Sequence, residues 1–187
     1  MVAGVVLDPP KGEMFVVERG RGAWLGRERL HVASDRDLSR ALVATGIPAA
    51  NAPHRHRATL AMLAAAMRDA AGIRRFSAAA LDLAYVAAGR FGVFFELGLK
   101  PWDIAAGALL VQEAGGRVTG VAGGPDFLDS GDVLATNGRL HTRMLAILAP
   151  SQARARRSRS AEIQDGRRAA QAASASRRSH TRRKASA

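Results

Sequence analysis

The stretch that decides the fold is residues 96–107, which read Glu96-Leu97-Gly98-Leu99-Lys100-Pro101-Trp102-Asp103-Ile104-Ala105-Ala106-Gly107. A helix is predicted over 103–114, and its residues are apolar almost all round, which is typical of a helix that is buried on most sides. The N-terminus of such a helix carries a partial positive charge and free N–H groups, so a carboxylate or a phosphate is favoured there. Taken alone, Asp103 is a weak signal, because an acid at this position more often only caps its own helix.

Further elements are predicted on both sides of this segment. A helix is expected over 79–88, because Leu81, Ala84, Tyr85 and Ala88 recur at helical spacing. Strands and helices alternate along most of the remaining chain, which indicates a layered α/β domain with helices packed on a sheet. The other predicted strands are 2–7, 13–18, 24–25, 29–32, 41–45, 74–76, 93–96, 117–119 and 132–136; the other predicted helices are 56–71 and 141–148, and an ordinary loop is expected over 120–131.

Composition limits the class of protein. The chain has 187 residues, 48% of them apolar, which is enough for one core with a tail. It contains no cysteine, which excludes disulfides and cysteine–zinc sites and fits a reducing cytoplasm. No run approaches the roughly 18 consecutive apolar residues of a membrane span. We therefore expect a cytoplasmic protein with no membrane partner.

The net charge of +12 is concentrated in the C-terminal tail. Residues 151–187 contain 11 Lys and Arg against two acids, whereas the preceding residues contain 17 against 14. Because the tail also has almost no large apolar residue, we predict a folded part over 1–149 and a disordered tail rich in Arg, Ala and Ser over 150–187. The tail has no aromatic residue to stack on bases, so we expect only weak electrostatic attraction to nucleic acid; a frame-shifted extension or a functionless solvated tail are the alternatives.

Several motifs occur together and in order. Trp102-Asp103-Ile104-Ala105-Ala106-Gly107 is followed by Glu113-Ala114-Gly115-Gly116, and Ser77-Ala78-Ala79-Ala80-Leu81-Asp82 precedes both. Gly4-Val5-Val6-Leu7-Asp8-Pro9 and Ala44-Thr45-Gly46-Ile47-Pro48 occur further upstream. Over residues 2 to about 148, this pattern resembles the C-terminal portion of the inositol monophosphatase family, whose fold is an αβαβα sandwich.

The resemblance implies a role for each matching residue. Asp103 corresponds to a metal ligand beside the substrate phosphate, and Glu96 to a residue that hydrogen-bonds substrate hydroxyls. Ser77, Ala78 and Ala79 correspond to a turn of small residues against the substrate. The implied chemistry is Mg²⁺-assisted hydrolysis of inositol monophosphate or a related small sugar phosphate. No residue of this chain is assigned as a catalytic acid, base or nucleophile.

The chain departs from the family pattern at its metal site. The family takes its other metal ligands from an N-terminal half, including an Asp-Pro-x-Asp-Gly-Thr segment that this sequence does not contain. Asp8-Pro9-Pro10-Lys11-Gly12 is the nearest match, and proline and glycine there predict a simple turn between two strands. We therefore expect this chain to be a fragment of a phosphomonoesterase that is inactive by itself. Whether the chain is an enzyme stays open.

The alternatives are a non-catalytic remnant or an interaction protein. An interaction protein would dimerise with an intact homologue, or it would bind nucleic acid through its tail. A homodimer of this chain is a further expectation. Three other residues are interpreted structurally. Trp24 and Trp102 are expected to pack in the core or at an interface, and Glu113 is expected to be a structural partner at the end of its helix.

The turn before the helix 79–88 departs from the family pattern. The family usually has glycine where this chain has Ser77, and Ser or Thr where it has Ala78.

Overall fold

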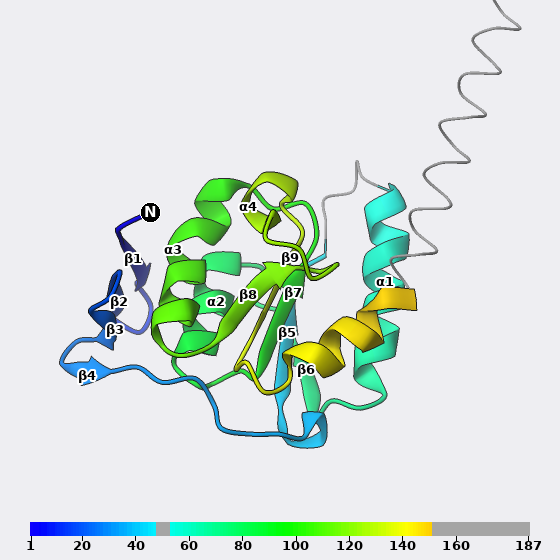
Figure 1. Ribbon diagram of the computed structural model, residues 1–187, viewed down its shortest axis with the longest axis horizontal. Coiled ribbons are helices and arrows are strands. Elements are labelled where there is room, and N and C mark those ends of the chain that lie inside the picture. The colour runs from blue at the N-terminus through cyan, green and yellow to red at the C-terminus, as the bar shows by residue number, and fades with distance from the viewer. Residues whose placement is uncertain (48–52, 151–187) are drawn as a thin grey trace, which may run out of the picture.

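Two β-sheets enclose a pair of helices in the computed structural model, which describes residues 1–47 and 53–150 (Figure 1). The first sheet has the order β1-β2-β3-β4 and the second the order β6-β5-β7-β9-β8. The strands are β1 Ala3–Asp8, β2 Glu13–Glu18, β3 Gly22–Leu25, β4 Glu28–Arg29, β5 Leu42–Thr45, β6 Gly72–Arg74, β7 Val93–Glu96, β8 Arg117–Gly120 and β9 Val133–Thr136. The helices are the 3-10 turn Leu38–Arg40, α1 Pro53–Met67, α2 Ala79–Ala87, α3 Pro101–Glu113, α4 Phe127–Ser130 and a C-terminal helix over 141–150.

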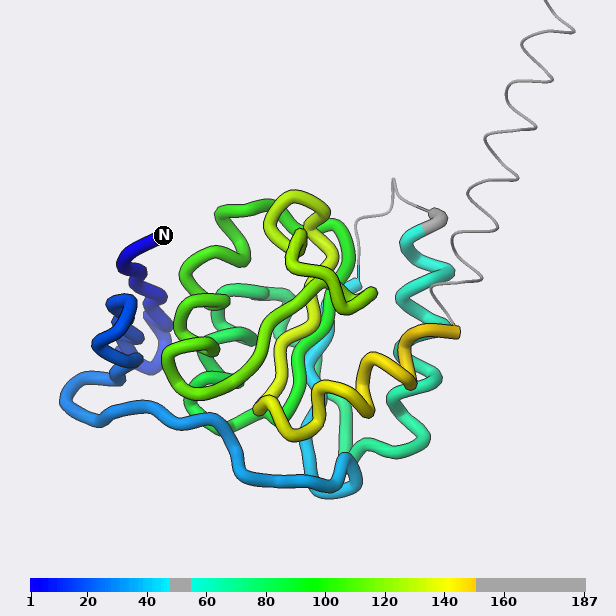
Figure 2. Tube along the Cα trace, viewed as in Figure 1, coloured from blue at the N-terminus to red at the C-terminus, as the bar shows by residue number. Residues whose placement is uncertain are grey.

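In space, the layers lie in the order sheet, helices, sheet, helices. One core lies between the two sheets around α2 and α3, and includes Phe15, Leu83 and Leu110. A second core lies between the second sheet and the pair formed by α1 and the C-terminal helix, and includes Met62 and Phe95. Figure 2 shows the link from β4 to β5 running past the central helices from the first sheet to the second. The layered α/β class predicted from the sequence is confirmed.

The first sheet begins with the predicted hairpin. β1 pairs with β2 in antiparallel register, with Val5 opposite Val16 and Leu7 opposite Met14. Side chains alternate along both strands, so Val6, Phe15 and Val17 are buried against the central helices. The opposite face of the hairpin carries Val5, Leu7, Met14 and Val16, which are 37–57% exposed. The hairpin is therefore apolar on both faces, and only one of them is covered by described residues.

Hydrogen bonds of its backbone and side chains hold the turn at Asp8-Pro9-Pro10-Lys11-Gly12. Gly12 N–H donates to Pro9 C=O at 3.2 Å. Asp8 is buried and accepts a 2.5 Å hydrogen bond from the Tyr85 hydroxyl, which in turn accepts one of 2.6 Å from Lys11 Nζ. The prediction of a turn is confirmed, and its acid serves to attach the hairpin to α2.

Glycines set the close packing of the central helices. A Cβ atom at Gly107 of α3 would lie 2.5 Å from Leu83 Cβ of α2, and one at Gly4 of β1 would lie 3.0 Å from Ala106 Cβ. Glu113, at the end of α3, accepts hydrogen bonds of 2.9 and 3.1 Å from the N–H groups of Gly20 and Gly22. The structural role predicted for Glu113 is confirmed, because it fixes the turn between β2 and β3.

Some predicted boundaries are wrong. The helix predicted over 56–71 is α1 at Pro53–Met67, and the strand predicted over 74–76 is β6 at Gly72–Arg74. The helix ends early because Asp69 and Ala70 N–H groups both bond back to Ala66 C=O, and the chain then turns to bring β6 beside β5. The strand predicted over 29–32 is only Glu28–Arg29. The loop predicted over 120–131 contains the short helix α4, which ends where Gly131 has φ 71°.

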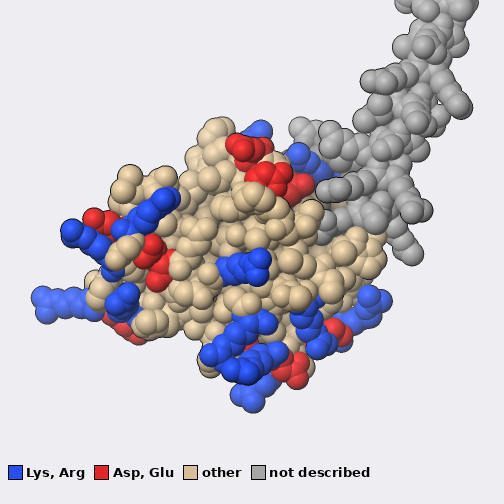
Figure 3. Space-filling model, viewed as in Figure 1, with Lys and Arg blue, Asp and Glu red and all other residues tan. Residues whose placement is uncertain are grey.

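Two further observations concern the surface and the tail. Trp102 is 77% exposed, so it does not pack in the core, and packing at an interface stays a prediction. On the face drawn in Figure 3, Lys and Arg side chains lie mainly near the border of the molecule, with Asp and Glu side chains among them. Within the described ranges no helix is long and apolar enough to span a bilayer. Residues 151–187 lie outside the described residues, so their predicted disorder and the boundary near 150 stay predictions.

Candidate functional site

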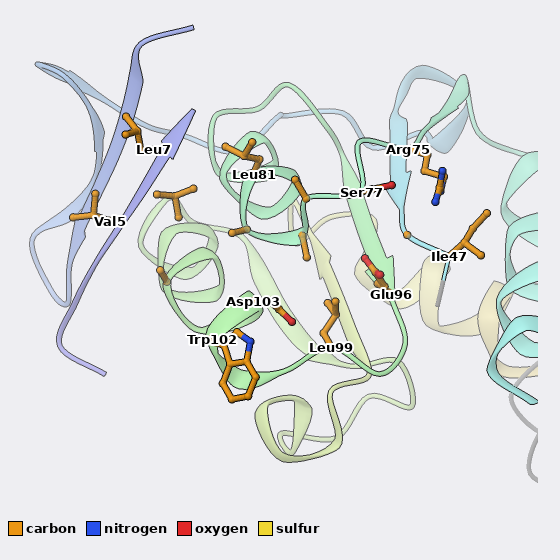
Figure 4. Close-up of a pocket in the computed structure, with 16 residues that line it drawn as sticks. Val5, Leu7, Ile47, Arg75, Ser77, Leu81, Glu96, Leu99, Trp102 and Asp103 are labelled. Atoms are coloured by element: carbon orange, nitrogen blue, oxygen red, sulfur yellow. The ribbon is translucent and has the colours of Figure 1, made fainter. Parts of the chain in front are cut away.

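A pocket of about 600 Å³ lies where the N-termini of α2 and α3 approach the end of β7 and the outer side of β1 (Figure 4). All five residues that the sequence assigned to a site border this pocket: Ser77, Ala78, Ala79, Glu96 and Asp103. They come from a loop, a strand end and two helix starts, so the fold brings together segments that are up to 26 residues apart in sequence. The predicted site residues are therefore neighbours in space.

Asp103 occupies the third position of α3 and makes a local hydrogen bond. The helix begins at Pro101, two residues earlier than predicted, because a proline at the first helical position leaves no backbone donor unpaired. Asp103 Oδ2 accepts a 2.9 Å hydrogen bond from Lys100 N–H. Asp103 thus caps its own helix and also borders the pocket. A capping role and a role in the site are therefore compatible for this residue.

Glu96 ends β7 and lies against the backbone of Gly46, which follows β5. A Cβ atom at Gly46 would lie 2.1 Å from Glu96 Oε1, so a side chain at position 46 would force the carboxylate to move from its place. Burial raises the pKa of Glu96 to about 7, with smaller contributions in the same direction from the charges of Asp82 and Asp103. Arg75, on the pocket wall, opposes this shift. Near neutral pH the Glu96 carboxyl is therefore divided between its protonated and ionised forms.

Asp82 is an acid of this region that sequence reasoning did not single out. It lies in the first turn of α2 and is fully buried, and the backbone of Ala78 gives its carboxylate only weak hydrogen-bond support. Burial raises its pKa to about 7, and its charge acts on Glu96. The signal in the sequence was a lone acid within the apolar helix 79–88, where a charged residue is unusual unless it has a partner or a function.

The turn before α2 has an unusual backbone. Ser77 has φ 61°, the only positive φ of a residue other than glycine in the described ranges. Ala78 takes the N-cap position, and no side chain caps the helix. The first N–H groups of α2 are therefore not satisfied by a cap, and the small side chains of Ala78 and Ala79 leave the backbone approachable. This end of the pocket suits an anion.

A divalent cation is not accommodated by the described residues alone. They contain no group of three or more Asp, Glu, His or Cys side chains with a geometry that could hold a metal ion. One oxygen of Asp103 is already engaged by Lys100 N–H. Mg²⁺ requires several oxygen ligands in an octahedron, so the acids present do not fit this ion by themselves. The predicted role of Asp103 as a metal ligand stays a prediction.

Comparison with known proteins shows the family to which the chain belongs. The model of the inositol monophosphatase family matches residues 1–153. An inositol-1-monophosphatase of Caulobacter vibrioides is 46% identical over 147 residues, which are 78% of this chain and 57% of that protein. A Nus factor SuhB of Pseudomonas aeruginosa is 47% identical over 147 residues, 78% of this chain and 54% of the other.

A solved structure agrees with these matches. The extragenic suppressor protein suhB of Bartonella henselae superimposes with a TM-score of 0.75 at 43% identity, and the match covers 79% of this chain and 56% of that one. The chain has the layered α/β fold of that structure, and it belongs to the inositol monophosphatase family. It spans little more than half the length of the relatives it matches.

Proposed function

We propose that this chain carries the substrate-binding part of a phosphomonoesterase for inositol monophosphate or a related small sugar phosphate. The observation that supports this most is the convergence of Glu96, Asp103 and the turn Ser77–Ala79 on one pocket of about 600 Å³ in a chain of this family. A pocket of that volume suits a small polar ligand. The uncapped start of α2 would face the phosphate, and Glu96 would accept hydrogen bonds from ring hydroxyls.

Mg²⁺, if it serves as in the family, would neutralise charge on the phosphate and activate water. Asp103 is the residue of this chain that would contribute a ligand. The other carboxylates would come from outside the described residues, either from a longer form of the same polypeptide or from a second polypeptide. As the 187-residue chain alone, the protein is proposed to be inactive.

Reconstitution tests this proposal. The chain is mixed with a polypeptide corresponding to the part of the Caulobacter vibrioides relative that it does not match, and phosphate release from inositol 1-phosphate is measured with and without Mg²⁺. We expect no release from the chain alone, release by the mixture, and loss of that release in Asp103→Asn. Asp129→Asn is the matched control, because Asp129 is exposed on α4 away from the pocket.

Two results would contradict the proposal. One is turnover by the purified chain alone at the rate of the intact relative. The other is an active mixture that Asp103→Asn leaves unaffected.

A second candidate is a non-catalytic interaction role. It is favoured by the names of several relatives, since proteins called Nus factor SuhB are as similar to this chain, at 45–47% identity, as the inositol-1-monophosphatase at 46%. Such a role would persist in the double variant Glu96→Gln/Asp103→Asn, whereas substrate binding would not. Isothermal titration of that variant with inositol 1-phosphate, beside the parent chain, separates the two candidates.

A further inference from the structure

Charge is distributed unevenly over the folded part of the chain. Residues 1–150 contain 17 Lys and Arg against 14 acids. This whole excess of three positive charges lies on one face, beside β8 and the start of the C-terminal helix, and the other charges of residues 1–150 balance. We call it the arginine face; its acids are Asp35, Asp37 and Asp69, and its exposed cations are Arg36, Arg40, Arg68, Arg117, Arg139 and Arg143.

The arginine face forms where the link from β4 to β5 meets the loop after β9. Arg139 donates a hydrogen bond to Ser34 C=O at 3.1 Å, and Asn137 Nδ2 donates one to Asp35 C=O at 2.8 Å. Arg40 Nε lies 3.5 Å from Asp35 Oδ1 on the same link. These contacts hold Arg40 and Arg139 close to the same short stretch of backbone.

Strand β8 and the turn after α1 complete this surface. Arg117 begins β8 opposite Thr136 of β9, directly before the loop that carries Arg139. Arg143 of the C-terminal helix donates to Asp69 at 3.0 Å, which brings the turn after α1 to the same side. Figure 3 shows Lys and Arg side chains gathered along the lower border of the molecule, where the link runs in Figure 1. Segments that are far apart in sequence therefore build one basic surface.

Most cations of the arginine face are not neutralised by the protein. Among the described residues only Arg40 and Arg143 of this set form ion pairs. Asp37, the remaining acid, accepts a 3.0 Å hydrogen bond from Ser39 N–H and so caps the 3-10 turn. A surface that carries an excess of one sign of charge raises the local concentration of ligands of the opposite sign. The face is therefore suited to a ligand with several negative charges.

The chemistry of this face favours a phosphate backbone over an acidic protein. A guanidinium presents its donors in a planar fork that binds two oxygens of a phosphate at once. Protein interfaces usually add a core of aromatic residues or Met. Of the large apolar side chains that are exposed in the described ranges, none lies in the segments 31–40, 68–71, 117–120 and 137–143 that build the face. These segments also contain no Phe, Tyr or Trp on which a base could stack.

We propose that the arginine face binds the phosphodiester backbone of nucleic acid, without reading the base sequence. The remaining chain supports this, because residues 151–187 carry 11 Lys and Arg against two acids. They follow the helix over 141–150, which is about 15 Å long and whose first turn carries Arg143. The face adjoins the second sheet, whereas the first residue of the chain lies beside the first sheet (Figure 1), so its exposure is independent of the edge of β1.

Two variants of equal charge test the proposal in the full 187-residue chain. The face variant is Arg36→Gln/Arg117→Gln, which removes two exposed cations that have no ion pair among the described residues. The control variant is Arg19→Gln/Arg27→Gln, at exposed positions in the turns of the first sheet. None of the four residues borders the pocket. Circular dichroism and urea unfolding should show that both variants fold like the parent.

Binding is measured by fluorescence anisotropy with a labelled single-stranded RNA of about 20 nucleotides and a duplex DNA of about 20 base pairs, between about 50 and 200 mM salt. Each phosphate contact contributes about 0.7 to 0.9 to the slope of log K against log salt concentration. The face variant should therefore reduce this slope by about 1.5 and weaken binding at least about fivefold, while the control changes the slope by less than about 0.5. The probe that binds more tightly at the higher salt concentration identifies RNA or DNA as the source of the backbone.

Three results would overturn the proposal. Equal salt slopes for the face variant and the control variant would mean that binding follows net charge alone. A parent chain that binds neither probe would exclude a nucleic-acid ligand. Polyglutamate that displaces the probe as effectively as unlabelled nucleic acid of the same charge would assign the face to an acidic protein surface.

Discussion

The carboxylate of Glu96 lies over the α-carbon of Gly46, so closely that a methyl group there would be 2.1 Å from Glu96 Oε1. Glu96 ends β7 and Gly46 directly follows β5, and these two neighbouring parallel strands set Thr45 opposite Phe95. The position of this pocket acid on the second sheet thus depends on the absence of a side chain on the next strand.

Gly46→Ala should displace Glu96 and destabilise the fold. The inserted Cβ meets only the terminal carboxylate of the flexible Glu96 side chain, which must move, so the cost lies at the low end of the range for overpacking, about 1 kcal/mol. Gly72→Ala at the start of β6 is the control, because its nearest neighbours would be 3.4 Å away; a change within about 0.5 kcal/mol is expected there. Urea unfolding of both variants checks the prediction, and equal stabilities of the two would contradict it.

Ser77→Gly should stabilise the chain or leave its stability unchanged. Ser77 has φ 61°, a region that costs an L-residue about 1–2 kcal/mol and costs glycine little. Part of that gain is offset because glycine makes the unfolded chain more flexible, so a net gain of up to about 1 kcal/mol is expected. The neighbouring Ala78→Gly, at φ −140°, should instead lose about 0.5–1 kcal/mol. The same sign for both substitutions in thermal unfolding would refute this account of the turn.

The sequence predicted the hairpin and the central helices well, and it failed where local signals are weak. Strand β2 was placed at the observed residues, because a short continuous run of apolar residues is bounded by turn residues on both sides. Helix α1 was misplaced by a few residues, since a run rich in alanine has little periodicity to mark its ends. The pairing of Glu96 with Gly46 could not be predicted from either segment alone, because it arises from the order of strands in the sheet.

The sequence predicted which residues border the pocket, but it did not predict the buried acid Asp82 or the raised pKa of its carboxyl group. Asp103, Glu96 and the turn at Ser77 were found through motifs, and all border the pocket. Asp82 was missed because an acid in a helix is ordinarily assigned to a solvent-facing side. Its burial, and hence the raised pKa of its carboxyl group, depends on the packing of α2 between both sheets, which no local pattern specifies.

Asp82→Asn should change how stability depends on pH. The folded-state pKa of Asp82 is raised to about 7 from an ordinary value near 3.8, so the folded chain holds this proton between those values while the unfolded chain has released it. The parent chain should therefore lose stability as pH rises through this window, by up to about 1.4 kcal/mol per pH unit from this group. The variant lacks this contribution, so its stability relative to the parent should increase from pH 5 to pH 8.

Asp129→Asn is the control for this measurement, because Asp129 is exposed on α4. Urea unfolding at a series of pH values gives the difference between each variant and the parent. A constant difference for Asp82→Asn across the window would show that the buried carboxyl does not bind a proton there.

His141 should act on stability in the opposite direction. Its ring is fully buried, with Nε2 3.0 Å from Thr119 Oγ1 and Nδ1 3.0 Å from Thr136 Oγ1. Burial, and secondarily the charge of Arg117, lowers the pKa of His141 to about 4 from 6.5. The folded chain therefore resists protonation that the unfolded chain accepts. Stability from this group is complete above about pH 6.5 and is lost as pH falls towards 4, by up to about 3 kcal/mol.

His141→Gln removes the titrating ring and should flatten this acid loss relative to the parent, even if the substitution lowers stability at neutral pH. Its effect is separable from that of Asp82, because the two contributions have opposite slopes and one variant removes each. His31→Gln, at an exposed position before β5, is the matched control. An acid loss that persists in His141→Gln, measured by urea unfolding between pH 4 and pH 7, would mean that another group carries it.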